Sequence, residues 1–386
     1  MKILVLCYEY PPIGGGGGRV AKTVAEKLSQ RGHELRVQTA GMPHLPAIED
    51  INGVVVHRAR SFRRREDRCT VPEMALFLAT SFLPTLRQIR QWHPDVIHAH
   101  FAVPTGALAY AASLFTNVPY VLTVHLGDVP GGFPDQTHQL FRFLKPLTIP
   151  IWRRAARITA VSGYVRDLAT KAYGLPVEKI VNGIDLTKAT SAPAALHAPR
   201  QLLFAGRFVS QKNLFVAVEA LAQIRDLDWR ATLIGDGPLL PGVRERVQAR
   251  GLDKRVILPG WQDAAAVEEA MAQSDVFLIP STAEGLPMAA VQALRHGLAI
   301  VGSDIGGLHD VIVPDRNGFR VPVGDVDALA ARLRKLMEDD ALLLTMKTAS
   351  REHAGLFDLD AIAIQYENLL RAAVEDVRGA PPDHGS

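Results

Sequence analysis

The chain has 386 residues with a formal net charge of +3, a length that suits two domains of ordinary size. Its two cysteines, Cys7 and Cys69, lie in a predicted buried strand and in a charged loop, which excludes a disulfide framework and favours a reducing compartment. We find no run of about 18 apolar residues and no basic-then-apolar leader. We therefore expect a cytoplasmic protein, either soluble or peripheral on the inner face of the membrane.

A glycine-rich loop at residues 14–18 follows the first predicted strand, Lys2 to Cys7, and precedes a helix expected from about Val20 to Gln30. Without Cβ atoms, its N–H groups can approach a ligand closely, at an entropic cost when the loop is ordered. Neither the P-loop pattern nor G-x-G-x-x-G fits this segment, which argues against a P-loop kinase and an NAD enzyme. The alternative to a ligand loop is a flexible turn. The residues predicted to contact a ligand are Gly15, Gly16, Gly17 and Gly18.

The first half of the chain is basic, because residues 1–190 carry a formal charge of +9 and the remainder carries −6. Much of this charge is one arginine cluster, which precedes the apolar segment Met74 to Leu83. A basic loop beside an apolar segment is typical of an enzyme that rests on anionic lipid, whereas the alternative is a solvated loop ahead of a core helix. No interleaved aromatic residues or binding motif supports a nucleic-acid partner. The cluster comprises Arg58, Arg60, Arg63, Arg64, Arg65 and Arg68.

Histidines follow two further predicted strands. His98 and His100 alternate along the first, and His125 follows the second, Val118 to Val124. An imidazole with a pKa near neutrality could hydrogen-bond a hydroxyl or shuttle a proton, a role we assign to His125; we expect His98 and His100 in the core or behind the site. These histidines and Asp128 could also be read as metal ligands. No closely spaced acidic pair supports a metal-bound diphosphate, so we predict no metal site.

The domain boundary is predicted near Asn182 to Asp185, because the segment from Thr187 to Arg200 has the Ala-, Pro-, Thr- and Ser-rich composition of a linker. The repeated order of strand and then helix on both sides predicts an α/β protein with two doubly wound parallel sheets. We predict a first domain over 1–186, a linker over 187–200, a second domain over 201–360, a last helix over 361–378 and a disordered tail over 379–386.

Two cations follow a predicted strand in the second half, Gln201 to Ala205. Arg207 comes directly after Gly206 at the carboxyl end of this strand, and Lys212 lies in the same loop. Open α/β sheets bind ligands at this edge. An Arg fork grips phosphate oxygens bidentately and Lys supplies a mobile point charge, so the pair could neutralise two phosphates. The alternative is a solvated turn with ordinary surface charges.

A carboxylate precedes the helix that follows the next buried strand, Val276 to Ile279. Pro287 is expected in the first helical turn, so that nearby N–H groups point toward an anion. Glu284 cannot bind phosphate because like charges repel, and we expect it to accept hydrogen bonds from sugar hydroxyls. The alternative is a partner of the helix dipole, contributing under about 1 kcal/mol. The N–H groups expected to face the anion belong to Leu286, Met288 and Ala289.

The order Gly206-Arg207-x4-Lys212-Asn213, then Glu284-Gly-x-Pro287, resembles the retaining nucleotide-sugar glycosyltransferases of family four over nearly the whole chain. This resemblance implies a GT-B fold, with two Rossmann-like domains facing across a cleft and the donor held mainly by the C-terminal one. It implies that Arg207 and Lys212 hold the diphosphate, that Glu284 and His125 contact the donor sugar, and that the last helix crosses back onto the first domain.

The chain departs from the family pattern at Gln292, where the family usually has a second Glu that grips the ribose. A neutral amide still hydrogen-bonds a hydroxyl, with about 1 kcal/mol in place of about 1.5–3 kcal/mol for a charged acceptor. We expect the nucleotide base to lie against the segments that hold Gly235, Gly237, Gly260 and Trp261. A weaker indication places Asp304, Gly306 and Gly307 near the sugar.

The predicted reaction is a retaining, metal-independent glycosyl transfer by front-face displacement, with Glu284, His125, Arg207 and Lys212 as catalytic residues. The donor is expected to be a UDP- or GDP-sugar with no further cofactor, and the acceptor an alcohol of a lipid-linked sugar or a polysaccharide or cell-envelope precursor. Two alternatives stay open: an epimerase or phosphorylase of the same fold, and a non-catalytic nucleotide-sugar-binding subunit. The sequence names neither sugar, base, acceptor, linkage nor oligomeric state.

Overall fold

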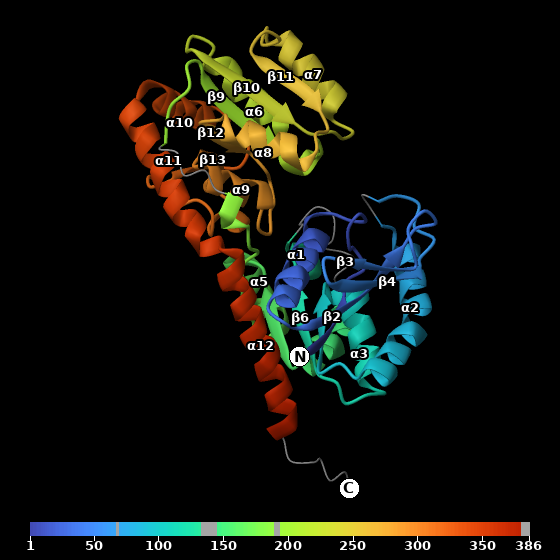
Figure 1. The fold of residues 1–386 in the computed structure, drawn as a ribbon. Coiled ribbons are helices and arrows are strands. Elements are labelled where there is room, and N and C mark those ends of the chain that lie inside the picture. Colours follow the sequence, from blue (N-terminus) through green and yellow to red (C-terminus); the bar gives the residue numbers. More distant parts are fainter. Residues whose placement is uncertain (67–68, 133–144, 189–193, 380–386) are drawn as a thin grey trace. The chain divides into compact units, whose positions relative to one another are not determined.

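The structure is a computed structural model that describes residues 1–66, 69–132, 145–188 and 194–379. The chain divides into two compact units (Figure 1). Unit 1 comprises Met1–Gly183 and Leu359–Ser386, and unit 2 comprises Ile184–Asp358. The predicted tail at 380–386 and the linker residues 189–193 lie outside the described residues.

Unit 1 is built on a sheet of eight strands in the order β3-β4-β2-β1-β5-β6-β7-β8, parallel except for the antiparallel pair β3 and β4. The inner strands β5 and β6 are buried at every position, as expected for parallel strands covered on both faces. The strands are β1 (Lys2–Leu6), β2 (Glu34–Gly41), β3 (Ile48–Ile51), β4 (Val54–Arg60), β5 (Val96–His100), β6 (Tyr120–Val124), β7 (Arg157–Ala160) and β8 (Glu178–Lys179).

The helices of unit 1 pack in pairs. Helix α1 contacts α12, and α2 contacts α3. Residues 145–154 are also helical. The last helix α12 contacts β5 and β6, which places the C-terminal helix in unit 1. The helices are α1 (Gly16–Gln30), α2 (Val71–Trp92), α3 (Ala107–Ser113), α5 (Gly163–Tyr173) and α12 (Leu359–Gly379).

Unit 2 has six parallel strands in the order β11-β10-β9-β12-β13-β14. Strands β10 and β11 lie on one side of β9, whereas β12, β13 and β14 lie on the other. Open α/β sheets bind ligands where the strand order changes direction in this way, here between β9 and β12. The strands are β9 (Arg200–Ala205), β10 (Trp229–Ile234), β11 (Val256–Gly260), β12 (Val276–Ile279), β13 (Ala299–Ser303) and β14 (Gly318–Val321).

Helices cover this second sheet in two groups. Helix α6 contacts α7 and α10, and α9 contacts α8 and α11. Buried aliphatic and aromatic side chains such as Leu202, Phe204, Leu233 and Leu333 form its core. The helices are α6 (Leu214–Gln223), α7 (Leu240–Ala249), α8 (Ala264–Ala272), α9 (Met288–His296), α10 (Val326–Glu338) and α11 (Asp340–Ala354).

The chain enters and leaves unit 2 at adjacent points. The Ile184 N–H donates to the Phe357 carbonyl at 2.8 Å, and Ile184 forms a parallel bridge with Asp358. Unit 2 is therefore one continuous segment whose two ends are hydrogen-bonded to each other.

Helix α1 begins at Gly16, with Gly15 as its N-cap, and not near Val20 as predicted. The glycines at 16, 17 and 18 thus form the first helical turn. Glycine is a poor helix former in a helix interior, but at a helix start it leaves the free N–H groups uncovered by side chains. Sequence propensity alone therefore placed the start of this helix one turn too late.

Candidate active site

The predicted donor-site residues of unit 2 follow the carboxyl ends of its parallel strands. Arg207 follows β9, Gly235 follows β10, Glu284 follows β12, and Gly307 lies in a 3-10 turn after β13. Because all six strands are parallel, these loops share one edge of the sheet. The fold therefore brings the separate sequence motifs to the same edge.

Lys212 and Glu284 form an ion pair at this edge. Lys212 Nζ donates to Glu284 Oε1 at 2.5 Å, and the two side chains are 19% and 9% exposed. Lys212 ends a short 3-10 turn (Ser210–Lys212), and Asn213 then adopts φ 51°, which turns the chain into α6. Arg207 is exposed in the same loop. The sequence predicted both residues for the site, but not this direct contact.

The loops that carry Lys212 and Glu284 are joined through Gln211. The Gln211 amide donates to the Ala283 carbonyl at 2.5 Å, and the Thr282 N–H donates to the Gln211 carbonyl at 2.8 Å. The Thr282 hydroxyl donates to the same carbonyl at 3.3 Å. Nothing in the sequence marked Gln211, because its role depends on a contact 72 residues away.

Helix α9 begins at Met288, so Pro287 is its N-cap and not a residue of its first turn as predicted. The N–H groups of Met288 and Ala289 are at the helix start, where no intrahelical acceptor exists. Gln292 lies one turn further on and is half-buried, as are Met288 and Ala289, whereas Ala290 and Val291 are buried. Gln292 therefore lies on the less buried side of α9, together with the first two helical residues.

Three glycines are required by close backbone packing around these loops. A Cβ atom on Gly235 would lie 1.8 Å from the Gly206 carbonyl oxygen, and one on Gly237 would lie 2.6 Å from the Phe208 carbonyl oxygen. A Cβ on Gly307 would lie 2.0 Å from the Glu284 carbonyl oxygen. These glycines support the loops of Arg207 and Glu284. Trp261 directly follows the edge strand β11 and is 69% exposed.

The glycine loop of unit 1 rests on Glu9. The Gly15 N–H donates to Glu9 Oε2 at 3.2 Å, and Arg63 lies 3.6 Å from Glu9 Oε1. A Cβ on Gly18 would lie 1.9 Å from the Glu9 carbonyl oxygen, whereas Cβ atoms on Gly15 or Gly16 would meet nothing within 4 Å. Gly15 and Gly16 are thus the two glycines with open space beside them. The sequence analysis did not single out Glu9.

A row of aromatic rings lies next to the first turn of α1. His98 and His100 are 4.3 Å apart between ring centroids, His100 and His125 are 6.0 Å apart, and Phe101 stacks on His125 at 4.4 Å. A Cβ on Gly17 would lie 2.5 Å from Phe101 Cζ and 3.3 Å from His125 Cε1. The structure therefore brings His125 and the glycine loop together, a contact that the sequence analysis did not predict.

Burial keeps these histidines neutral. It lowers the pKa of His125 to about 4, the pKa of His98 to about 3, and the pKa of His100 well below its usual range. This corrects the expectation of a His125 pKa near neutrality. His98 Nε2 lies 2.8 Å from Thr123 Oγ1, which fits the expected core position. A neutral imidazole at position 125 can still exchange hydrogen bonds with a hydroxyl.

Asp128 fixes the segments on either side of His125. Its Oδ2 accepts the His125 N–H at 2.8 Å, and its Oδ1 accepts the Ala102 N–H at 2.8 Å. Burial raises the pKa of Asp128 to about 7, although these backbone hydrogen bonds act in the opposite direction. Within the described ranges, no group of three or more His, Cys, Asp or Glu side chains could hold a metal ion. Through its two hydrogen bonds, Asp128 holds the segments that contain His125 and Ala102 together.

The arginine cluster divides into inward and outward members. Arg58 is buried and donates to Glu49 and to the Pro11 carbonyl, and the buried Arg63 donates to the Arg65 and Glu66 carbonyls. These two arginines cannot reach a lipid headgroup, which corrects their assignment to a membrane surface. Arg68 lies outside the described residues. The members with exposed side chains are Arg60, Arg64 and Arg65.

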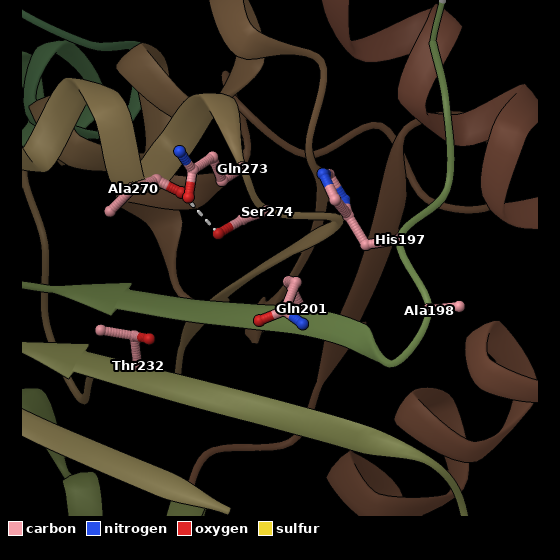
Figure 2. A pocket seen from close by; sticks show the side chains of 7 residues that line it. All are labelled: His197, Ala198, Gln201, Thr232, Ala270, Gln273 and Ser274. Atoms are coloured by element: carbon pink, nitrogen blue, oxygen red, sulfur yellow. Dashed lines mark hydrogen bonds between the residues drawn. The ribbon is translucent and has the colours of Figure 1, made fainter.

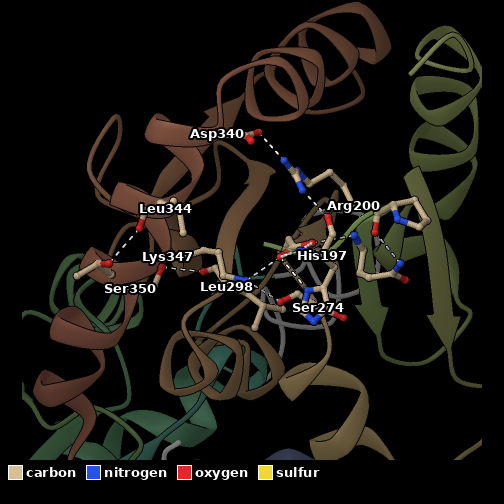
Figure 3. A network of polar contacts seen from close by, with 12 residues as sticks. His197, Arg200, Ser274, Leu298, Asp340, Leu344, Lys347 and Ser350 are labelled. Carbon is tan, nitrogen blue, oxygen red and sulfur yellow. Dashed lines mark hydrogen bonds and ion pairs between the residues drawn. The ribbon is translucent and has the colours of Figure 1, made fainter. Parts of the chain in front are cut away.

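Unit 2 also has a polar pocket beside the amino end of β9, away from the loops of Arg207 and Glu284 (Figure 2). It is lined by residues before and within β9, among them His197 and Gln201, and by Gln273 and Ser274 before β12. Next to it, the buried Lys347 donates to Asp275 at 2.8 Å and to the Ser274 carbonyl at 3.0 Å, and His197 lies 3.0 Å from Asp275 (Figure 3). This network ties α11 to the residues that precede β12, at the amino edge of the sheet.

Two family models match consecutive halves of the chain. The model described as Glycosyltransferase Family 4 matches residues 14–188, and the model described as Glycosyl transferases group 1 matches residues 189–353. Together with the two parallel-sheet α/β units, these matches define the protein as a GT-B glycosyltransferase. The chain belongs to the group 1 glycosyltransferases.

Individual proteins agree with this assignment over the full length. The chain is 26% identical to the N-acetyl-alpha-D-glucosaminyl L-malate synthase of Bacillus anthracis, covering 97% of this chain and 98% of that one. The structure of sucrose-phosphate synthase from Thermosynechococcus elongatus superposes with a TM-score of 0.83 at 21% identity, covering 97% and 99% of the two chains. HepE of Anabaena, solved in complex with UDP, superposes with a TM-score of 0.78 at 20% identity, covering 96% and 100%. The expected GT-B fold is confirmed.

Proposed function

We propose that this glycosyltransferase moves a sugar from a nucleoside diphosphate sugar to an alcohol with retention of configuration and without a metal ion. The observation that carries the proposal is the set of groups on one sheet edge of unit 2: Arg207, the Lys212–Glu284 pair, and the first N–H groups of α9. Cations and helix N-termini stabilise phosphate, and a carboxylate among them suits sugar hydroxyls.

The leaving diphosphate is the group that these cations stabilise. Charge builds up on the phosphate oxygen as the glycosidic bond breaks, and positive groups already fixed in place lower the barrier without reorganisation. Arg207 would grip the diphosphate bidentately from its exposed position, and the Met288 and Ala289 N–H groups would face an anion at the start of α9. Such a site needs no metal for the charge of the diphosphate.

Glu284 would bind the donor sugar, and Lys212 would hold the Glu284 carboxylate in place. Lys212 contacts Oε1, so Oε2 is the oxygen that we assign to a sugar hydroxyl. His125 would exchange a hydrogen bond with the sugar as a neutral imidazole, since its pKa is lowered to about 4. With no side chain assigned as nucleophile, we propose front-face displacement, in which the leaving phosphate oxygen takes the proton of the acceptor hydroxyl.

The comparisons support the choice of substrates. HepE, a structural neighbour, binds UDP, and we extend a UDP-sugar donor to this chain. The relative from Bacillus anthracis is named for a glucosaminyl L-malate product, which supports transfer to a hydroxyl group. We propose a lipid-linked sugar or a cell-envelope glycan precursor as acceptor, and a cytoplasmic enzyme peripheral on the inner face of the membrane.

A thermal-shift screen of the purified protein against UDP-, GDP-, ADP- and TDP-sugars, each with and without magnesium, tests the donor site. A ligand that binds only the folded state raises the melting temperature by mass action. We expect a metal-independent shift with UDP-sugars. A shift that requires magnesium would contradict metal independence, and no shift with any nucleotide sugar would contradict the donor site.

A second experiment separates transfer from other reactions of a bound donor. The protein is incubated with the donor found in the screen and a panel of alcohols, and the products are resolved by NMR. Transfer with retention gives a new glycoside with the anomeric configuration of the donor. Release of an epimer, or binding without turnover across the panel, would favour one of the two alternative readings of the sequence.

A further inference from the structure

Phe62 in unit 1 combines an exposed aromatic ring with a strained backbone. It is 70% exposed and has a φ of 51°, in the left-handed region that bulky side chains rarely adopt. A single exposed apolar side chain is ordinary on a protein surface, but one held in this conformation is not. Such strain persists only where the surrounding structure imposes it, and it is concentrated at functional sites.

The neighbours of Phe62 impose this conformation. Ser61 is buried, and its hydroxyl donates to the carbonyl of Gly41, the last residue of β2, at 2.9 Å. Arg63 is also buried, and its Nε donates to the Arg65 carbonyl at 2.9 Å. Because both adjacent side chains are held inward, the chain exposes Phe62 beside the carboxyl end of β2. Open α/β sheets bind their ligands at this edge.

The segment that carries Phe62 lies against the glycine loop. The Gly14 N–H donates to the Glu66 carbonyl at 2.7 Å, and the same carbonyl accepts from Arg63 Nη2 at 3.2 Å. Arg63 Nη2 also lies 3.6 Å from Glu9 Oε1. Arg63 therefore connects the segment of Phe62 both to the loop and to the Glu9 carboxylate.

The two carboxylate oxygens of Glu9 have different surroundings. Oε2 accepts the Gly15 N–H at 3.2 Å, whereas Oε1 is 3.6 Å from Arg63, which exceeds hydrogen-bonding distance. The Glu9 carbonyl accepts from Cys7 Sγ at 3.1 Å, which helps to fix the backbone. The side chain is 16% exposed. Glu9 therefore offers Oε1 to a hydroxyl group from a fixed position.

The first turn of α1 brings Glu9 near the residue of unit 1 that is proposed to contact the donor sugar. Gly15 donates to Glu9, and a Cβ on Gly17, two residues further on, would lie 3.3 Å from His125 Cε1. Reacting groups must approach within about 3–3.5 Å of each other, so the acceptor has to bind beside the donor sugar. Glu9 is thus placed where an acceptor hydroxyl is required.

We propose that Glu9 and Phe62 bind a sugar ring of the acceptor. A pyranose has an apolar face of C–H groups and a rim of hydroxyls. The Phe62 ring covers the apolar face, and Glu9 Oε1 accepts a hydrogen bond from a hydroxyl. The proposal rests on the proposed function and narrows its acceptor to a hydroxyl carried on a sugar ring, with two named residues that select it.

Saturation-transfer NMR with a panel of methyl hexopyranosides, recorded with and without UDP, measures this binding directly. We expect the unmodified protein to bind at least one of these glycosides. Phe62→Asn should lower its affinity about tenfold, because Asn tolerates the left-handed conformation but removes the ring. Phe62→Tyr keeps the ring and should retain binding. Glu9→Gln keeps an acceptor for Gly15 but loses the charge, and should lower affinity by about 3- to 10-fold.

Phe115→Ala is the matched control, because Phe115 is another exposed phenylalanine of unit 1, at 63%. It should bind glycosides like the unmodified protein. Phe62→Asn should keep or raise the melting temperature, since it relieves backbone strain. Absence of binding to every glycoside of the panel, or equal binding by Phe62→Asn, would overturn the proposal.

Further readouts distinguish this proposal from the donor assignment and from a lipid contact. No thermal shift with any nucleotide sugar would contradict the donor site, while glycoside signals recorded without UDP would still test Glu9 and Phe62. With an active enzyme, Phe62→Asn should raise the KM for a sugar acceptor and not for the donor, and an unchanged acceptor KM would overturn this proposal alone. Loss of attachment to anionic vesicles by Phe62→Asn, with glycoside binding retained, would also overturn it.

Discussion

The proposed ligand-binding residues of unit 1 and those of unit 2 handle buried polar groups in opposite ways. In unit 1, the row of His98, His100 and His125 is buried and neutral, because desolvation disfavours the charged imidazole. In unit 2, Lys212 and Glu284 are also largely removed from solvent, but they keep opposite charges in direct contact. A diphosphate needs fixed positive charge, which unit 2 offers, whereas the neutral imidazoles of unit 1 suit contacts with uncharged hydroxyls.

This comparison is most strongly tested at Glu284. Glu284→Gln keeps a carbonyl oxygen for Lys212 but removes the charge, so we expect kcat to fall by about 10- to 100-fold, equivalent to the loss of a charged hydrogen bond. Nucleotide affinity, measured by calorimetry with UDP, should change little. Glu284→Ala is a poorer test, because it leaves the half-buried Lys212 without its partner.

Lys212→Ala is the companion variant, and it should weaken nucleotide binding itself. If both variants reduced nucleotide affinity equally, the separate roles of sugar binding and diphosphate binding would be contradicted. If neither changed turnover, the charged edge of unit 2 would not be the site.

In unit 1, substitutions at two adjacent glycines, Gly16 and Gly17, separate packing from ligand contact. Gly17→Ala would place a Cβ 2.5 Å from the Phe101 ring, so we expect a loss of about 1–3 kcal/mol in the free energy of unfolding. Gly16→Ala meets nothing within 4 Å and should change stability by less than about 0.5 kcal/mol. Chemical denaturation measures both.

Activity then distinguishes the roles of the two glycines. We expect Gly16→Ala to lower kcat/KM for the donor despite unchanged stability, because it adds a methyl group where the ligand is proposed to approach. Full activity in a stable Gly16→Ala protein would argue that the loop does not contact the donor.

The neutral histidines also predict a pH dependence of stability. A histidine whose folded pKa is lowered stabilises the fold above its unfolded pKa of about 6.5, and this contribution is lost as the pH falls toward the folded value, about 4 for His125. The raised pKa of Asp128 acts in the opposite sense, because its contribution is present below about pH 4 and is lost as the pH rises through about 7.

His100→Leu isolates one member of the row. It should reduce the slope of unfolding free energy against pH by up to about 1.4 kcal/mol per pH unit below pH 6.5, since each group contributes at most one proton. Denaturant titrations between pH 4.5 and 7 measure this slope. An unchanged slope would mean that His100 is protonated in the folded protein.

The smallest expected effect concerns Gln292. Gln292→Glu should tighten binding of the donor by about 2- to 10-fold if this side chain bonds the ribose, because a charged acceptor makes the stronger hydrogen bond. Isothermal titration with the nucleotide alone tests the assignment. Weaker or unchanged binding would place Gln292 away from the ribose.

The sequence predicted the fold and the positions of the charged motifs, because apolar runs followed by Gly206 or by Pro280 mark where buried strands end. It placed Arg207, Lys212 and Glu284 on one edge, and the structure puts them there. It could not predict the Lys212–Glu284 contact or the Gln211 bridge, since these depend on how two distant loops pack. It also treated Arg58 and Arg63 as surface charges, because composition does not reveal which arginines turn inward to carboxylates and carbonyls.

The two ends of unit 2 are hydrogen-bonded to each other, so this unit is a single insertion within the sequence of unit 1. Ile184 and Phe357 are joined by a hydrogen bond, so two cuts at neighbouring points separate the unit 2 loops proposed to bind the donor as one uninterrupted piece of chain. A segment inserted through adjacent ends can be replaced without rethreading its host. Exchange of residues 184–358 between relatives could therefore alter the choice of donor while leaving the sheet and the glycine loop of unit 1 in their own sequence.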